Sequence, residues 1–354
     1  MSAIGDVARL AGVSKSTASR ALSGRGYVSD ATRERVVQAA ADLGFVVSSN
    51  AASLVTGQTR NVGVVIPFIN RWFFAEVLDG IESALISSGY DLTLYRLSPD
   101  AEQRRRVFDY FLVRKRVDAV IAIGIELTAR EVDQLRSLGK PIVGLGGPIE
   151  GIPTVNIDDV DVARMATELL INLGHRKIMH LGGDLDEQMD FRVHAQRLSG
   201  FRLAMSAAGL DSDDNFRAVP FDIPGGYEGA LKVLADPRQR PTAIVAGCDE
   251  VAVGVIVAAR QLGIQIPSQL SVVGIDGHSL APMFGLTTFE QYPSRQGSTA
   301  ASIILETLAG TDQGEAPREL RRTMPVSLAV RGSTTAPASE DRGTKSRRAS
   351  RERP

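Results

Sequence analysis

The sequence has few of the residues that build disulfide frameworks and metal sites. It contains one cysteine, Cys248, so no disulfide can form within the chain, and this fits a reducing compartment. Its four histidines include no pair spaced four residues apart and no neighbouring cysteine cluster, so the spacing typical of zinc ligands is missing. We therefore expect neither a metal ion nor another cofactor.

Long apolar runs and a strong net charge are missing as well. No run reaches the roughly 18 to 20 apolar residues that cross a bilayer. Residues 1–14 show no basic start followed by a long apolar stretch, so we expect no signal peptide, no membrane partner and a cytoplasmic location. The formal net charge is −1, so any nucleic-acid surface has to be local.

Motifs of common catalytic sites are also absent. The chain has no G-x-S-x-G elbow, no recognisable carboxylate pair and no motif context that would make Cys248 a nucleophile. The segment 144–151, GLGGPIEG, is rich in glycine but lacks both the G-x-G-x-x-G spacing and a P-loop lysine. We therefore expect that the protein is not an enzyme.

The first 60 residues differ from the rest of the chain. They hold seven Lys and Arg against four Asp and Glu, a local net charge of 7 − 4 = +3. Apolar residues at helical spacing predict three short helices. The first ends at Gly12, the second is capped by Ser14, and the third begins at Ser29 as its cap and ends at Gly44. The tight turn between the first two is typical of a helix-turn-helix.

From Asn61 onward, apolar strand-like runs alternate with amphipathic helical stretches. The strand-like runs are 61–67, 91–95, 117–123, 141–145, 177–183, 242–247 and 271–276. This alternation predicts parallel sheets covered by helices, and about 270 residues are more than one ordinary sheet needs. The predicted fold class is therefore α/β, with an all-α head followed by two doubly wound parallel-sheet lobes.

Several segments, in order along residues 3–332, resemble the lactose-repressor (LacI/GalR) family of bacterial transcriptional regulators. The head segments are DVARLAGVSKSTASRALSG and YVSDATRERVVQAAADLGF, and the core begins with NVGVVIPFINRWFFAEVLDGIE. Later segments are INLGHRKIMHLGG, RLSGFRLAM, PTAIVAGCDEVAVGVI, SVVGIDG and LTTFEQ. The resemblance implies a helix-turn-helix joined to a core like a periplasmic binding protein.

This organisation divides the chain into four regions. We expect residues 1–46 to be the DNA-binding domain, 47–59 a hinge helix or linker, 60–332 the effector-binding and dimerisation core, and 333–354 a disordered basic tail. Within the core, we expect the N-lobe at about 60–158 and 290–320, and the C-lobe at about 159–289 and 321–332.

The second helix of a helix-turn-helix lies in the major groove of DNA. The resemblance implies that Lys15, Ser16 and Arg20 read bases there, and Arg suits this role because it pairs bidentately with guanine. Short hydroxyls suit phosphate contacts, and one aromatic matches a further family contact position. These residues are Thr17, Ser19, Ser23 and Tyr27. The alternative for Lys15 and Arg20 is that they are merely solvated.

Leu54 is a lone large apolar residue in a linker of small polar residues. In the family, a leucine from each hinge helix wedges into a central base step of the minor groove, which the resemblance implies for Leu54. Ala51, one turn earlier, would let two hinge helices approach each other. Val47 and Ser48 depart from the usual Pro-Asn, and Leu54 packing on the core is the alternative.

The resemblance places an effector site in the cleft between the lobes, at the carboxyl ends of the strands. Aromatic rings can stack on a sugar face, an arginine can donate to hydroxyls, and carboxylates can accept from vicinal hydroxyls. The residues implied are Trp72, Phe73, Phe74, Arg197, Asp249 and Asp276. For Phe74, a place in the core is an equal alternative.

Three departures from the family pattern remove polar groups from the expected pocket. Cys248 replaces a frequent asparagine, Gly146 and Gly147 replace a common Asp-Arg pair, and Gly277 replaces a second acid after Asp276. We expect the pocket to have gained room, and therefore an effector larger than a monosaccharide, such as a di- or oligosaccharide.

The sequence thus predicts a sequence-specific DNA-binding regulator, expected to repress carbohydrate-utilisation genes. A homodimer would bind a palindromic operator, because each head makes few contacts, and a sugar between the lobes would control the affinity allosterically. The alternatives are a soluble sugar-binding protein and a sugar-acting enzyme. Whether the ligand is an inducer or a corepressor stays open.

Overall fold

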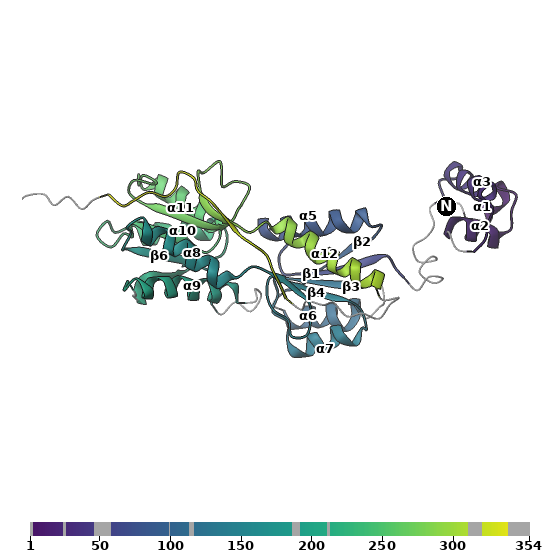
Figure 1. The fold of residues 1–354 in the computed structure, drawn as a ribbon, viewed down its shortest axis with the longest axis horizontal. Helices are drawn as coiled ribbons and strands as arrows, with labels where there is room; N and C mark the ends of the chain where they lie inside the picture. The colour runs from purple at the N-terminus through teal and green to yellow at the C-terminus, as the bar shows by residue number, and fades with distance from the viewer. Residues whose placement is uncertain are drawn as a thin grey trace, which may run out of the picture.

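The computed structural model describes residues 3–23, 26–45, 58–98, 100–112, 117–185, 192–210, 213–310 and 321–338. These residues form a helical head and two six-stranded sheets, each covered by helices on both faces (Figure 1). The predicted fold class is confirmed. None of the helices in these ranges has the length and apolar character needed to span a bilayer.

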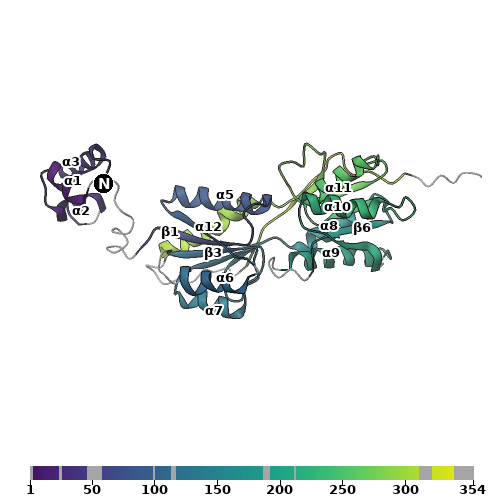
Figure 2. The ribbon, with the colours of Figure 1, turned by 180° about the vertical axis from the view of Figure 1, so that it is seen from behind.

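The head consists of three short helices, α1 (Ile4–Leu10), α2 (Lys15–Ser23) and α3 (Asp30–Asp42). Their core is built from small side chains, which let the helices approach closely. The buried members are Val7, Ala8, Ala11, Ala18, Ala21, Val36, Ala39 and Ala40. The head is therefore a separate packing unit with its own core, as Figures 1 and 2 show.

The two predicted helix caps have different outcomes. Ser14 caps α2, because its Oγ accepts a hydrogen bond from the backbone N–H of Thr17 at 3.1 Å. Ser29 lies at the N-cap position of α3 but makes no cap bond to a backbone N–H. Its hydroxyl instead donates to Thr32 Oγ1 at 2.9 Å, so the predicted capping role of Ser29 is wrong.

The first lobe has a fully parallel sheet in the order β11-β5-β4-β3-β1-β2. Its strands are β1 (Asn61–Ile66), β2 (Asp91–Arg96), β3 (Ala119–Ile123), β4 (Ile142–Leu145), β5 (Thr154–Asn156) and β11 (Arg321–Thr323). Helices α5 (Trp72–Ser87) and α12 (Pro293–Gly310) cover one face. The other face carries α6 (Ala101–Arg106), a π-helical turn at Val107–Leu112 and α7 (Ala129–Ser137).

The second lobe repeats this plan, in the order β12-β10-β9-β8-β6-β7. Its strands are β6 (Ile178–Gly182), β7 (Phe216–Ala218), β8 (Ala243–Ala246), β9 (Ser271–Asp276), β10 (Thr287–Glu290) and β12 (Ser327–Ala329). Only β12 runs antiparallel to its neighbour. Its helices are α8 (Asp159–Asn172), α9 (Val193–Ala207), α10 (Ile223–Leu234) and α11 (Asp249–Gln261), and a 3-10 turn occupies Asp213–Asn215.

The chain passes between the lobes after β5, after β10 and after β11. The structure changes two predicted boundaries. Residues 321–323 pair with β5 in the first sheet, so assigning all of 321–332 to the C-lobe is wrong. Ser333 Oγ donates to Val272 O at 2.6 Å and the Thr335 N–H donates to Ser271 Oγ at 3.1 Å, so the tail does not begin at 333.

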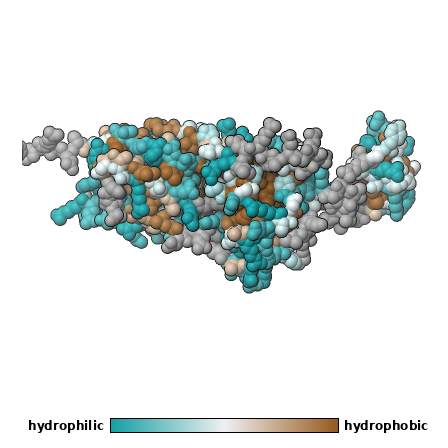
Figure 3. Space-filling model, turned by 60° about the horizontal axis from the view of Figure 1, so that its bottom comes forward, coloured by the Kyte–Doolittle hydropathy of each residue, from teal (hydrophilic) through white to brown (hydrophobic). Residues whose placement is uncertain are grey.

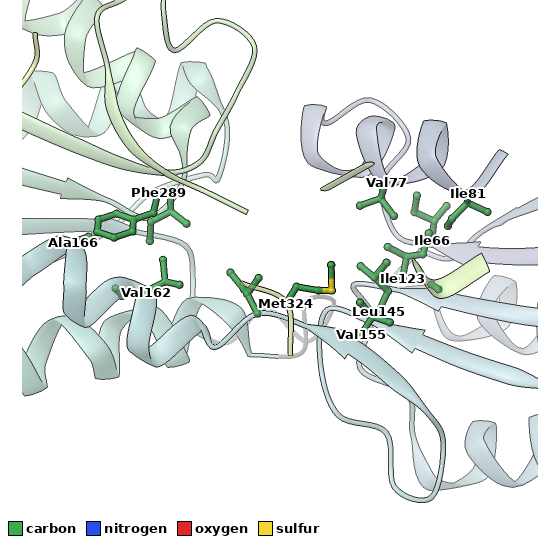
Figure 4. Packing of buried hydrophobic residues seen from close by; sticks show 14 of the residues in the cluster. Ile66, Val77, Ile81, Ile123, Leu145, Val155, Val162, Ala166, Phe289 and Met324 are labelled. Carbon is green, nitrogen blue, oxygen red and sulfur yellow. The ribbon is translucent and has the colours of Figure 1, made fainter. Parts of the chain in front are cut away.

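The buried core continues through the connection between the lobes. Met324 lies between the two groups of core side chains in Figure 4, with Leu145 and Val155 on the side of the first lobe and Phe289 on the side of the second. Because this connection is apolar and buried, the lobes are joined by packing as well as by three chain segments.

Candidate functional site

The first turn of α2 carries a cluster of hydroxyls. The capping oxygen of Ser14 lies 2.8 Å from Ser16 Oγ and 2.9 Å from Thr17 Oγ1. The hydroxyls of Ser16 and Thr17 are therefore engaged with the cap in this structure. To contact DNA they have to share or exchange that hydrogen bond.

The other predicted DNA-contact residues differ in what holds them. Lys15, Ser19 and Arg20 are exposed on α2, and Figure 3 shows a largely hydrophilic surface on the displayed face of the head. Ser23 Oγ donates to Arg20 O at 3.4 Å, within its own helix. Tyr27 is 93 % exposed, so its ring contributes nothing to the core of the head.

The hinge lies mostly outside the described residues, and so do Ala51 and Leu54. Its last part is anchored to the first lobe. The N–H of Thr59 donates to Asp118 Oδ1 at 2.8 Å, and the N–H of Arg60 donates to Asp118 Oδ2 at 2.7 Å. The linker therefore leaves the first lobe from a fixed point, so a shift of this lobe moves that point.

A cavity of about 90 Å³ lies between the lobes at the carboxyl ends of the strands. The wall from the first lobe includes Phe68, Arg71, Phe73, Phe74, Gly124 and Gly146. The wall from the second lobe includes Asp159, His194, Arg197, Phe221, Cys248, Glu250 and Asp276. The cavity therefore combines aromatic rings with several charged groups, and this combination suits a ring-shaped polar ligand.

Phe74 serves both the core and the cavity, so the two predicted alternatives hold together. Its ring packs against the core and lies 5.6 Å from the Phe68 ring and 5.3 Å from the Phe73 ring, centroid to centroid. A Cβ built on Gly124 would lie 2.6 Å from Phe74 Cε1, and Gly124 has a φ of +53°. Gly124 therefore leaves the space that this ring needs.

Arg197 is the buried centre of charge in the cavity. Its Nε donates to Asp159 Oδ1 at 2.8 Å, its Nη1 donates to Gly247 O, and the same Nη1 lies 3.6 Å from Asp276 Oδ1. Burial alone would lower the pKa of Arg197, but attraction to Asp159 and Asp276 outweighs it and raises the pKa. The guanidinium thus stays charged and links Asp159, at the start of α8, to Gly247 and Asp276 at the ends of β8 and β9.

The two predicted carboxylates occupy different environments. Asp276 lines the cavity, has a strained φ of +137°, and accepts a hydrogen bond from Gln291 Nε2 at 2.6 Å. Asp249 is fully buried and is not among the lining residues. It accepts from Thr288 Oγ1 at 2.6 Å and from the His278 N–H at 2.7 Å. Asp249 therefore holds the strand ends together rather than facing a ligand.

Burial raises the pKa of both carboxyls, since a charged carboxylate loses hydration inside the protein. For Asp276, attraction to Arg197 opposes this rise without cancelling it. For Asp249, hydrogen bonds from Thr288 and His278 oppose it. The cleft therefore contains a carboxyl, Asp276, whose charged form is disfavoured by burial and favoured by Arg197.

Trp72 and Gly277 also lie elsewhere than the sequence suggested. The Trp72 ring stacks on His278 with centroids 4.5 Å apart and does not line the cavity. A Cβ on Gly277 would lie 2.8 Å from Glu290 Cγ, and its φ is +78°. Gly277 is thus required by its own turn, and its lack of a side chain adds no room to the cavity.

Sequence reasoning missed several cavity residues. Glu250 follows Asp249, and Gln291 is the last residue of the segment LTTFEQ. Both therefore lie next to or within segments that the sequence analysis singled out, and this position could have identified them. Phe221 and Arg71 had no such signal, because their approach depends on how the two lobes face each other. Within the described ranges no group of three or more His, Cys, Asp or Glu could hold a metal ion.

Comparison with known proteins gives two family matches. Residues 3–48 match the model of "Bacterial regulatory proteins, lacI family", and residues 167–334 match that of a "Periplasmic binding protein-like domain". The chain is 34 % identical over 324 residues to the HTH-type transcriptional repressor PurR of Vibrio atlanticus (strain LGP32), covering 88 % of this chain and 93 % of the relative.

Other relatives agree in kind. Catabolite control protein A of Priestia megaterium is 33 % identical over 282 residues, which cover 78 % of this chain and 83 % of that protein. A transcriptional regulator CelR–cellobiose complex has a TM-score of 0.67 and 26 % identity, covering 94 % and 100 % of the two chains. A lac repressor dimer bound to operator and an anti-inducer has a TM-score of 0.81, 24 % identity and coverage of 95 % and 99 %. These relatives are regulators rather than enzymes.

Proposed function

Because the chain belongs to the lacI family of bacterial regulatory proteins, we propose that it is a cytoplasmic transcriptional repressor whose operator affinity is set by a small molecule between its lobes. The observation that carries the proposal is the combination of a polar helix-turn-helix with a separate cavity that both lobes line. A fixed anchor at Asp118 connects the two, since it ties the end of the linker to the first lobe.

In the head, we assign base reading to Lys15, Ser16 and Arg20, all exposed on α2. We assign phosphate contacts to the short hydroxyls of Thr17, Ser19 and Ser23, and a further DNA contact to Tyr27. A homodimer would present two heads to the half-sites of a palindromic operator. Between the heads, Leu54 would enter the minor groove and Ala51 would let the two hinge segments approach each other.

For the effector, we propose a carbohydrate, with a disaccharide as the leading case. Phe73, Phe74 and Phe221 offer flat apolar faces, and Arg197 and Asp276 offer a donor and an acceptor. Two solved relatives support this class, one a complex with cellobiose and another with bound ribose. A planar nitrogen heterocycle is the second candidate, because the phenylalanine rings around the cavity equally suit stacking with an aromatic base.

The ligand can act only by binding one arrangement of the lobes more tightly than another. Movement of the first lobe carries the linker anchor at Asp118 and so changes the separation of the two heads in a dimer. A coupling of about 1–3 kcal/mol is enough for useful switching. Both induction and corepression are compatible with this geometry, and the direction is an outcome of the experiment.

The test is a gel-shift titration of the full chain with a palindromic duplex from its own upstream region, repeated with cellobiose, ribose and hypoxanthine. We expect specific binding that one of these ligands changes. Arg20→Ala should lower specific affinity by about 1–3 kcal/mol while ligand binding, measured by calorimetry, stays unchanged. Ligand binding without DNA binding would favour a soluble sugar-binding protein, and turnover of the sugar would favour an enzyme.

A further inference from the structure

Gly5 is an unusual residue for its place in the head. It is the second residue of α1, and glycine is a poor helix former because it loses more backbone freedom on ordering than other residues. Positive φ angles explain the other described glycines of the head, Gly12, Gly26 and Gly44, but Gly5 has none. The backbone of α1 therefore gives no reason for a glycine at this position.

The space beside Gly5 is occupied by Lys15, the first residue of α2. A Cβ built on Gly5 would lie 2.9 Å from Lys15 Cε and 3.5 Å from Lys15 Nζ. The ammonium group also interacts with α1 through Asp6. The pKa of Asp6 is lowered chiefly by the hydrogen bond from the Ala3 N–H, and Arg9 and Lys15 add attraction. The Lys15 side chain thus runs from the start of α2 across α1.

We propose that Gly5 is a positioning residue for operator recognition, because the missing side chain allows Lys15 to lie across α1 in one orientation at the leading end of α2. This inference rests on the proposed role of Lys15 in reading bases. A lysine stem packed against a neighbouring helix has fewer rotamers to lose when it binds. Gly5 would therefore affect which base Lys15 reads as well as how tightly it binds.

A methyl group at position 5 should move Lys15 without harming the fold. The atoms that must shift are the far end of a flexible side chain, and alanine favours a helix more than glycine does. Arg20 has a similar neighbour in Gly26, whose built Cβ would lie 3.2 Å from Arg20 Cδ. Gly26 has a φ of +78°, so any substitution there also strains the backbone, and Gly5 gives the cleaner test.

The experiment uses the full chain as wild type, Gly5→Ala, Lys15→Ala and the double variant. The probe is the palindromic duplex that the wild type recovers from a random-sequence pool. We expect Gly5→Ala to bind this duplex roughly fivefold or more weakly, and to relax the base preference at one position in each half-site. Its melting temperature should not fall. Gly310→Ala is the matched control, because nothing lies within 4 Å of its built Cβ, and it should bind as wild type does.

The double variant separates positioning from direct contact. Once Lys15→Ala has removed the stem, adding Gly5→Ala should change neither affinity nor base preference. An equal loss in that background would mean that α1 itself needs a glycine to approach the DNA, which overturns the proposal, as would wild-type binding by Gly5→Ala. Failure of the proposed function looks different: the wild type would recover no preferred duplex, or Lys15→Ala would bind it unchanged.

Discussion

His180 is a titratable residue whose surroundings disfavour its charged form. It lies on β6, fully buried, and its ring stacks with the rings of Phe201 and Phe216. Its Nδ1–H donates to Val245 O at 3.0 Å, while its buried Nε2 has no hydrogen-bond partner among the residues that the structure describes. Burial lowers the pKa of His180 from 6.5 to about 4, because a charged imidazolium would lose its hydration there.

This depressed pKa predicts a loss of stability in acid. The unfolded chain binds the proton near pH 6.5 and the folded protein only near pH 4, so the contribution is complete above pH 6.5 and disappears as the pH falls toward 4. The full change amounts to about 3 kcal/mol. Urea unfolding at several pH values should show a steeper acid loss for the wild type than for His180→Leu. Equal slopes for the two proteins would contradict this account.

At the scale of the elements, glycines let paired helices approach each other. On α5, a Cβ at Gly80 would lie 1.9 Å from Ser294 O, and on α12 a Cβ at Gly297 would lie 2.1 Å from Val77 O. The pair α10 and α11 shows the same arrangement, with Gly226 beside Val251 O and Gly254 beside Ile223 O. Because the obstructing atoms are backbone, the helices cannot make room by changing a rotamer.

We therefore expect Gly297→Ala to destabilise the first lobe by about 3 kcal/mol or more, since α5 and α12 would have to separate. Gly310→Ala is a control in the same helix, α12, with no atom near the added carbon. It should be neutral or stabilising by up to about 1 kcal/mol, as alanine favours a helix. Urea unfolding measures both variants. A small effect of Gly297→Ala, similar to that of Gly310→Ala, would show that the helix pair is loosely packed.

The elements also show why sequence predicts some strands and not others. β1 and β9 are buried on both faces, so each is a largely apolar run, and the sequence predicts their bounds within a residue or two. β11 is three exposed polar residues, and it is a strand only because β5 lies beside it. For the candidate site, too, the sequence predicts which residues follow a strand but not which of their side chains face the cavity. Asp249 and Asp276 both follow a strand, and only the packed structure shows that Asp249 points inward.

At the scale of the whole molecule, contacts in the cavity wall and beside it connect the two lobes. Trp72 of the first lobe stacks on His278 of the second, and Arg71 Nη1 donates to Phe221 O at 3.0 Å. Any rotation of one lobe against the other has to change these contacts. Trp72 is the only tryptophan of the chain, so its fluorescence reports on this one junction.

The stack makes the fluorescence of Trp72 dependent on pH. His278 Nδ1 accepts a hydrogen bond from the Leu280 N–H at 2.9 Å, and burial lowers the pKa of His278 below 6.5. Protonation places a charged imidazolium against the indole, which quenches its emission, so we expect quenching with a midpoint below pH 6.5. His278→Gln should abolish this titration, and a ligand that separates the lobes should weaken it in the wild type. Emission that titrates equally in His278→Gln would show that Trp72 senses another group and that the stack does not link the lobes in solution.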